Sequence, residues 1–428
     1  MKLPDKIDNS IIRSKAGNED IPIMDFILNK IKMLPEHSTI FAACPNSESV
    51  LKASIRAAKR ANAPIKFAAT LNQVDLDGGY TGWSQDVFVK KIKEECARYG
   101  FEGPVIVAID HGGPWLKDLH SINNLSLDQT MKAIKNSFEA AILAGYDLIH
   151  VDPTVDRASA LGENISIDTV AKRTIELIVH TEEFRRRKNL PRISYEVGTE
   201  EVHGGLADMA VFRKFLELLK QGLKQNGFED TWPCFIVGKV GTDLHTAFFD
   251  PKTASELSAE AARFNSLIKG HYTDSVDNPG DYPKAGMGGA NVGPEFTEAE
   301  YEALAELVDM EETLFQSRFI AQRSCFASIL KDAVIKSGRW KKWLKGDEQG
   351  KDFQEISLER QTWLVKTGCR YIWADHNVQN SRNILYKNLQ NNGIAAEERV
   401  LLKIETVMDK YFREFNLINL NSRIQQII

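Results

Sequence analysis

Histidine and carboxylate side chains recur at or directly after short apolar runs, where parallel strands would end. Four of the nine histidines are placed in this way: His111, His203, His245 and His271. The carboxylates that share this placement are Asp110, Asp152, Glu196, Glu200 and Asp274. Imidazole and carboxylate groups are common ligands of zinc and similar divalent ions, and burying such groups without partners is costly. The pattern predicts a divalent metal site, with zinc as the first candidate and manganese or nickel as alternatives.

Each of these side chains also has a purely structural interpretation. A single histidine after a strand is more often a hydrogen-bonded loop residue than a ligand. The joint placement of His111 and His271 favours the ligand role, whereas both interpretations stay open for His203 and His245. Lys239 could form a Schiff base, but a lysine beside glycine at a strand end is more often a phosphate or carboxylate binder.

Glycine pairs occur in several of the same loops. Gly78-Gly79 and Gly204-Gly205 match neither the GxGxxG nor the GxxxxGK[ST] spacing, and no protein-kinase signature set is present. The sequence therefore predicts neither a nucleotide site nor a kinase. Backbone amides of Gly112-Gly113 or Gly288-Gly289 could hold a phosphate or only form turns.

Eight short apolar runs would position these residues. They are Thr39–Cys44, Ile65–Thr70, Pro104–Asp110, Leu148–Pro153, Arg192–Gly198, Pro233–Val240, Asn265–Gly270 and Gly289–Gly293. Helical patterns separate them, among them Ser47–Asn62, Ser84–Tyr99, Leu127–Ala144 and Ile167–Arg187. Strands that alternate with helices pair in parallel, and eight such units favour a closed (β/α)8 TIM barrel over an open doubly wound sheet. The active site of such a barrel lies at the carboxyl ends of its strands.

The pattern changes near Thr297, after which only helices are expected. Helical stretches are predicted at Glu298–Lys336, which would form one or two helices, and at Leu358–Lys366 and Glu397–Phe415. We therefore expect a barrel over residues 1–297 and a helical C-terminal region over residues 298–428. That region would pack on the barrel or contribute to an oligomer interface.

Bulk composition narrows the class of protein. The net charge is -5, and the one basic tract, Arg185–Lys188, is typical of a solvated helix end, so no nucleic-acid partner is expected. Five widely spaced cysteines without a CxxC pair predict neither a disulfide framework nor a zinc ribbon. No apolar leader or membrane-length apolar run is present. These features predict a cytoplasmic enzyme, expected to be a homo-oligomer.

Several blocks resemble one family. Thr70–Val74 (TLNQV) with Gly78–Gly82 (GGYTG) is similar to the signature of the non-catalytic, or Z-type, subunit of class II D-tagatose-1,6-bisphosphate aldolase. Further similar blocks follow in the same order: Asp110-His111, His150–Asp152, Gly198–Glu200 with Gly204-Gly205, His271–Asp274 and Arg370–Trp373. The resemblance spans nearly the whole chain. It implies a TIM barrel in which Asp110 is the proton donor, His111 and His271 are metal ligands, and Glu200 is a ligand or an acid/base.

The chain departs from the class II aldolase pattern at some positions. The histidine expected after the sixth strand has no match, because Gly238–Gly241 (GKVG) occupies its place. Asp152 or Glu200 could complete a different ligand set. Gly113–Trp115 and His203 also differ from the family pattern at the presumed substrate rim, which suggests a different sugar.

We therefore expect a metal-dependent carbon–carbon lyase or sugar epimerase that acts on a ketohexose or its phosphate. The expected catalytic residues are Asp110, Glu200 and Asp274, and the expected metal ligands are His111, Glu200 and His271. The expected substrate-binding residues are Asn72, Gln73, Gly79, Thr81, Asp152, Lys239 and Asn291. The alternative is a non-catalytic accessory subunit that stabilises a separate aldolase subunit, and a third option is a sugar-binding module without turnover.

Overall fold

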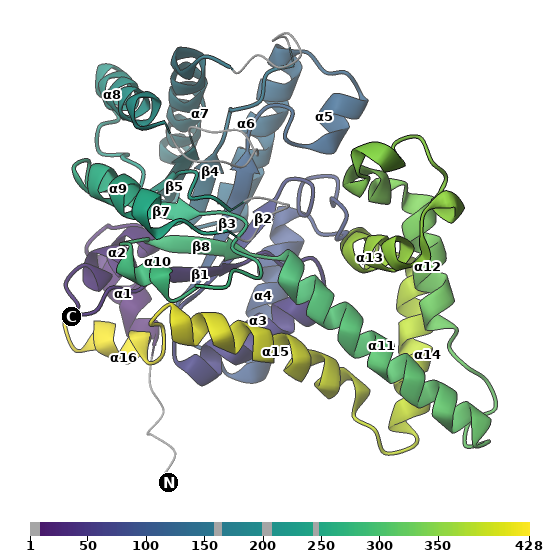
Figure 1. Cartoon of the computed structure of the whole chain (residues 1–428). Coiled ribbons are helices and arrows are strands. Elements are labelled where there is room, and N and C mark those ends of the chain that lie inside the picture. Colours follow the sequence, from purple (N-terminus) through teal and green to yellow (C-terminus); the bar gives the residue numbers. More distant parts are fainter. Residues whose placement is uncertain (1–8, 158–164, 199–207, 243–247) are drawn as a thin grey trace.

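Eight parallel strands close into a barrel in sequence order (Figure 1). A computed structural model describes residues 9–157, 165–198, 208–242 and 248–428. The strands are β1 (Ile40–Ala43), β2 (Ile65–Thr70), β3 (Val105–Gly112), β4 (Leu148–Val151), β5 (Ser194–Gly198), β6 (Phe235–Val237), β7 (Leu267–Gly270) and β8 (Gly289–Val292). All eight predicted strands are present, and β8 pairs with β1. The predicted (β/α)8 barrel is confirmed, and the open sheet is excluded.

Helices on the outside of the barrel cover the strands. They are α3 (Glu48–Ala61), α4 (Gln85–Tyr99), α6 (Leu127–Ala144), α7 (Ile167–Arg187), α8 (Met209–Gln225) and α9 (Pro251–Ala262). Side-chain hydrogen bonds to backbone amides cap the first turn of several of these helices. Ser47 caps α3 by accepting a hydrogen bond from the amide of Val50, and Ser126 forms a capping box with Gln129 at α6. Two short helices, α5 (Asp118–Ile122) and α10 (Asp281–Lys284), lie in loops that follow β3 and β7.

Two helices that the sequence analysis did not identify cover the amino end of the barrel. α1 spans Ser10–Asn18 and α2 spans Ile23–Ile31. The Arg13 guanidinium pairs with Asp147, which precedes β4, at 2.8 Å. Asp25 accepts a hydrogen bond from Ser194 at the start of β5. These two helices therefore cover the barrel at the amino ends of its strands, and a functional site is expected at the carboxyl ends.

After β8 the chain is helical, as predicted. The helices are α11 (Pro294–Gln316), α12 (Phe326–Ser337), α13 (Leu358–Gly368), α14 (His376–Gln390), α15 (Ala396–Glu414) and α16 (Leu420–Gln425). Short 3-10 helices include η1 (Arg339–Trp343) and η4 (Cys369–Tyr371). The predicted stretch at Glu298–Lys336 forms two helices, and α14 was not predicted. Figure 1 shows α11 to α14 beside the barrel and α15 running beneath it.

Helix α15 packs directly on the barrel wall. Phe41 of β1 stacks on Tyr411 at a centroid distance of 5.8 Å and contacts Phe412 edge-on at 5.2 Å. Arg56 of α3 pairs with the buried Glu405 at 2.7 Å. The C-terminal region thus packs against β1 and α3.

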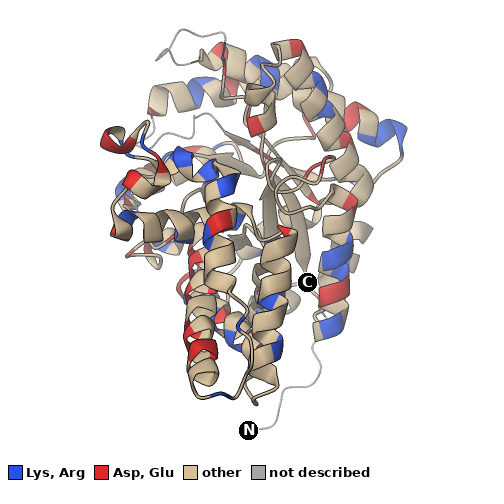
Figure 2. Cartoon of the chain, turned by 90° about the vertical axis from the view of Figure 1, so that its right-hand side faces the viewer, with Lys and Arg blue, Asp and Glu red and all other residues tan. Residues whose placement is uncertain are grey.

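Positively and negatively charged residues alternate along the helices that face the viewer in Figure 2. Among the described residues, no helix combines the length and apolar character needed to cross a membrane.

Candidate active site

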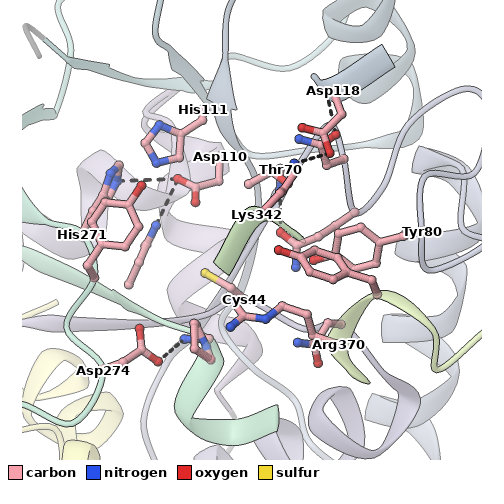
Figure 3. Close-up of a pocket in the computed structure, with 18 of the residues that line it drawn as sticks. Cys44, Thr70, Tyr80, Asp110, His111, Asp118, His271, Asp274, Lys342 and Arg370 are labelled. Atoms are coloured by element: carbon pink, nitrogen blue, oxygen red, sulfur yellow. Dashed lines mark hydrogen bonds and ion pairs between the residues drawn. The ribbon is translucent and has the colours of Figure 1, made fainter. Parts of the chain in front are cut away.

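A cluster of ionisable side chains lies at the carboxyl ends of the strands (Figure 3). Asp110 is at its centre, at the end of β3. Its Oδ1 accepts a hydrogen bond from Asn291 Nδ2 of β8 at 3.0 Å. The same oxygen lies 3.5 Å from His150 Nδ1 and 3.6 Å from His271 Nε2. Side chains of β3, β4 and β8 and the residue after β7 thus converge on one carboxylate.

Three imidazole rings surround this carboxylate. The His111 and His271 ring centroids are 4.4 Å apart, and His150 lies 5.0 Å from His111 and 5.2 Å from His271. His111 adopts a left-handed backbone conformation with φ of 49°, beside a register shift between β3 and β4. Bulges of this kind redirect side chains and recur next to active sites. The bulge thus allows adjacent residues, Asp110 and His111, both to reach the cluster.

Hydrogen bonds hold two of these imidazoles in place. His111 Nδ1 lies 2.5 Å from Asp152 Oδ2, and Thr154 donates to the other oxygen of Asp152 at 2.5 Å. The backbone amide of His111 donates to His150 Nδ1 at 3.0 Å. His150 Nε2 is buried and has no hydrogen-bond partner among the described residues.

Two buried lysines bracket Glu196 on β5. Lys269 Nζ of β7 lies 2.5 Å from Glu196 Oε1, and Lys66 Nζ of β2 lies 3.0 Å from Oε2. His271 Nε2 is 3.2 Å from the same Oε1. Both lysines are 1% exposed, and Glu196 is fully buried. Such a network requires compensating charges, because an unpaired charge in this environment would be strongly destabilising.

The cluster holds its imidazoles in different protonation states. Burial opposes the charged form of His111, but Asp110 and Asp152 raise its pKa to about 9. Burial, together with the charges on His111 and Lys269, lowers the pKa of His271 to about 3. Burial also opposes ionisation of Asp110, yet His111 and His271 hold its pKa well below the usual range. Without a bound ion, these shifts favour the protonated form of His111, the neutral form of His271 and the ionised form of Asp110.

The donor set is suited to a divalent ion. Asp110, His150, Glu196 and His271 offer ligand atoms within 4.8 Å of one another, and so do His111, His150 and Asp152. Neutral imidazole nitrogens and carboxylate oxygens are the usual ligands of zinc and related ions. Because His150 Nδ1 accepts the amide of His111, the proton of a neutral His150 ring lies on the orphaned Nε2. His150 could bind an ion only if one of its ring nitrogens gave up this arrangement. Glu196 is the least available donor, since both of its oxygens contact lysines.

A cavity of about 200 Å3 opens beside the cluster. Barrel residues form one part of its wall, and residues of η1 and η4 form another. The lining comprises Cys44, Asn46, Thr70, Asn72, Gln73, Tyr80, Asp110, His111, Asp118, His271, Tyr272, Asp274, Asn291, Gly293, Pro294, Arg339, Lys342, Arg370 and Tyr371. The C-terminal region therefore contributes directly to the candidate site.

The loop after β2 frames the cavity. Asn72 donates to the carbonyl of Leu116 at 3.0 Å and accepts from the amide of Asp118 at 2.9 Å. Gln73 donates to the carbonyl of Pro45 at 3.0 Å. Thr81 donates to the Gln73 carbonyl at 2.6 Å. A Cβ on Gly79 would lie 2.3 Å from that same carbonyl oxygen, so the turn requires glycine there.

The structure brings together some of the predicted site residues. Asp110, His111, His271 and Asn291 belong to the cluster, and Asp152 contacts His111 through its Nδ1. Asn72, Gln73 and Asp274 line the cavity, whereas Gly79 and Thr81 shape the loop and are not part of the described lining. Lys239 is half-buried and likewise outside that lining. Glu200, His203 and His245 lie outside the described residues.

Asp274 occupies a different part of the cavity from the cluster (Figure 3). Its Oδ1 accepts hydrogen bonds from the amides of Gly293 at 2.9 Å and Glu295 at 2.8 Å, at the start of α11. Burial raises its pKa to about 6, although these amides act in the opposite direction. Asp274 therefore anchors α11 to the loop after β7.

Sequence reasoning did not assign a role to three residues of the cluster, Lys66, His150 and Lys269, and it placed Glu196 only among the candidate metal-binding carboxylates. A signal for the two lysines was present, because each is a charged residue inside an otherwise apolar strand. Arg339, Lys342 and Arg370 in the cavity wall had no such local signal.

Comparisons with solved structures agree with this architecture. A probable tagatose 6 phosphate kinase from Sinorhizobium meliloti 1021 is similar with a TM-score of 0.73 and 21% identity, over 88% of this chain and 100% of that chain. Fructose-bisphosphate aldolase from Campylobacter jejuni is similar with a TM-score of 0.54 and 12% identity, over 96% of each chain. At these identities the likeness shows the fold. The family match covers residues 27–426, and the chain belongs to the D-tagatose-1,6-bisphosphate aldolase subunit GatZ/KbaZ-like family.

Proposed function

We propose that this chain catalyses metal-dependent aldol, retro-aldol or epimerisation chemistry on a ketohexose or its phosphate. One observation carries the proposal: Asp110, hydrogen-bonded to Asn291, lies among three imidazoles beside a cavity at the carboxyl end of the barrel. Each of His111 and His271 offers a ligand atom within 4.8 Å of one on His150, and these three rings would hold the ion, which would displace the proton of His111. Glu200, also expected as a ligand from the sequence, lies outside the described residues. A divalent metal held there would polarise a carbonyl or stabilise an alkoxide.

The residues of the chain would transfer the proton and orient the groups around it. Asp110, as a carboxylate, is suited to accept a proton from the substrate and to return it. Asn291 orients Asp110 through its amide hydrogen bond. Asp152 orients His111 through its contact with Nδ1. Glu196, which both Lys66 and Lys269 contact, lies against His271 Nε2 and would orient that ring. Epimerisation by cleavage and re-addition would require the same groups as cleavage alone.

We also infer that the chain is not a kinase, although a structural relative carries that description. The sequence contains no GxxxxGK[ST] segment and no kinase signature set. The groups gathered at the cavity are suited to proton transfer and carbonyl polarisation.

One observation favours a second candidate, the non-catalytic accessory subunit. The carboxylates of Asp110, Asp152 and Glu196 are matched by three cationic groups, on Lys66, Lys269 and His111. The cluster is therefore electrically balanced without an ion. In this case the described site would bind a sugar and stabilise the fold, and a separate aldolase subunit would perform the reaction.

Assays of the purified chain distinguish the two candidates. The chain is incubated with zinc, manganese or nickel and with ketohexoses, their monophosphates and their bisphosphates, and cleavage and epimerisation are followed by NMR. Metal-dependent turnover by the chain alone supports the first candidate. Turnover only after addition of an aldolase subunit supports the second, and turnover that EDTA does not affect contradicts the metal proposal.

A further inference from the structure

Helix α5, in the loop after β3, has little packing of its own. The residue before it, Lys117, pairs with Asp75 at 2.6 Å and with Asp77 at 2.8 Å, and these contacts fix the start of the helix to the loop after β2. Within α5 itself only His120 is buried, and Ile122 is 73% exposed. Segments with so few buried apolar groups open at a low free energy. Helix α5 can therefore move without disturbing the core.

The first residue of α5, Asp118, contacts the C-terminal region. Its Oδ2 lies 2.6 Å from Lys342 Nζ and 3.2 Å from Arg339 Nη2, both in η1. All three side chains line the cavity. Figure 3 shows Asp118 and Lys342 on one side of the pocket and His271 on the other. We call Asp118, Arg339 and Lys342 the ionic clasp.

An aromatic contact joins the same two parts of the chain. Tyr80, in the loop after β2, meets Tyr371 of η4 edge-on at a ring-centroid distance of 5.2 Å. The Arg339 guanidinium lies 4.8 Å from the Tyr371 ring and 5.4 Å from the Tyr80 ring. These cation–π contacts fix Arg339 in the cavity wall. Asp118 is thus the member of the ionic clasp that lies on the more weakly packed element.

We propose that α5 is a lid over the candidate site and that the ionic clasp holds this lid closed. Separation of Asp118 from η1 would widen the cavity between the loop after β3 and the C-terminal region, and a ligand would enter there. Ion pairs at partly exposed positions contribute little individually. The closed state would therefore be favoured only modestly, and the lid would open without unfolding of the barrel.

The lid would give the C-terminal region a role in access as well as in folding. A closed lid excludes water from the site beneath it, which strengthens electrostatic contacts there. This role concerns entry to the cavity, so it does not depend on the reaction proposed above.

Cys44 is a reporter of lid opening. It follows β1 directly, lines the cavity and is half-buried. The full chain is reacted with N-methylmaleimide and with the bulkier N-cyclohexylmaleimide, and labelling of each cysteine is followed by peptide mass spectrometry. Both reagents attack through the thiolate, so a change in thiol reactivity alters both rates alike. The ratio of the bulky to the small rate therefore reports access.

Removal of the clasp charge should open the lid. We expect Asp118→Asn to raise the rate ratio at Cys44 by roughly threefold or more, the order of a lost ion pair, because the amide keeps the shape of the side chain without its charge. High salt should raise the ratio in the wild type and have no effect on Asp118→Asn, since salt screens ion pairs. The charge swap of Asp118→Lys with Lys342→Asp should return the ratio toward the wild-type value.

A distant ion pair provides the matched control. Lys403→Met removes the contact of Lys403 with Glu306 between α15 and α11, and it should leave the ratio at Cys44 unchanged. The side chain of Lys342 is 49% exposed, so Lys342→Met keeps the test valid if Asp118→Asn does not fold.

The remaining cysteines distinguish lid opening from unfolding. Cys325 is exposed and should react equally in all variants, whereas Cys234 and Cys369 are buried and should stay unreactive. An unchanged ratio at Cys44 in Asp118→Asn and Lys342→Met overturns the lid, and so does an equal rise in Lys403→Met. Labelling of Cys234 and Cys369 in step with Cys44 would show that the clasp stabilises the whole fold, which also contradicts the proposal. Failure of the proposed function leaves these results intact, because labelling requires neither metal nor turnover.

Discussion

Asp110 has the most constrained environment of the candidate catalytic residues. It is 5% exposed, accepts a hydrogen bond from Asn291 and lies within 3.6 Å of two imidazoles. Burial opposes the charged form of both His111 and His271, and the two differ in their neighbours: Asp110 and Asp152 raise the pKa of His111, whereas His111 and Lys269 lower that of His271 further. Two imidazoles in one cluster thus have different pKa values because their neighbouring charges differ.

Substitution of the cluster residues separates metal binding from proton transfer. We expect Asp110→Asn to keep its metal and lower kcat by roughly 10²- to 10⁴-fold, the usual contribution of a general acid–base group. His111→Ala and His271→Ala should each lose bound metal, because each removes an imidazole donor. Metal content is measured by plasma mass spectrometry beside the activity assay.

His180→Ala provides the matched control, since His180 lies on α7 and pairs with Glu139 outside the cluster. It should retain both metal and activity. Undiminished metal in both His111→Ala and His271→Ala would remove the ion-binding proposal.

At the scale of elements, the loop after β7 is tied to the start of α11 by Asp274. The pKa of Asp274 is raised to about 6 in the folded protein, with burial as the largest cause. An acid with a raised pKa stabilises the fold in its protonated form, and this contribution is lost as pH rises from about 4 through about 6.

Asp274→Asn should remove this pH dependence. An asparagine oxygen can still accept the amides of Gly293 and Glu295 but cannot ionise. Between pH 4.5 and 7.5 the variant should gain on the order of 2 kcal/mol in unfolding free energy relative to the wild type, since one pKa unit corresponds to about 1.4 kcal/mol. Urea denaturation across this range measures the difference.

Asp277→Asn, an exposed substitution in the same loop, is the control and should follow the wild type. Parallel pH profiles for Asp274→Asn and the wild type would show that the Asp274 carboxyl group does not titrate as described.

At the scale of the whole molecule, the C-terminal region and the barrel share one core. Phe41, Phe296, Tyr411 and Phe412 are fully buried and in mutual contact across β1, α11 and α15. The amide of Asn419 also donates to the carbonyl of Ala61 at the end of α3. The barrel therefore depends on residues more than 350 positions away from β1.

Phe412→Ala should destabilise the whole chain. Removal of a buried phenylalanine costs about 3–5 kcal/mol through lost burial and the cavity that remains. Thermal denaturation followed by circular dichroism should show one transition at a lower Tm.

Phe319→Ala, at a side chain that is 70% exposed, should change stability by less than about 0.5 kcal/mol. A Phe412→Ala variant with an unchanged barrel transition and a separate early transition would contradict a shared core.

Features with a local cause could be predicted from the sequence. Buried parallel strands are largely apolar runs, and this made all eight recognisable although β6 has only three residues. Because every strand of a closed parallel barrel ends at the same face, Asp110, His111, His271 and Asn291 could be expected to meet there. Helices α1 and α2 were missed because they are brief, with nine residues each, and α14 was missed because most of its residues are polar. Packing stabilises all three.

Tertiary structure alone decided which partners these residues find. Lys66 and Lys269 neutralise Glu196 only because β2, β5 and β7 face one another across the barrel. The bulge at His111 turns adjacent residues of β3 toward a single cluster. Arg339, Lys342 and Arg370 reach the cavity only after the helical region folds back over the carboxyl end of the barrel. Such contacts join residues far apart along the chain, and no local pattern encodes them, so they emerge only when the chain has packed.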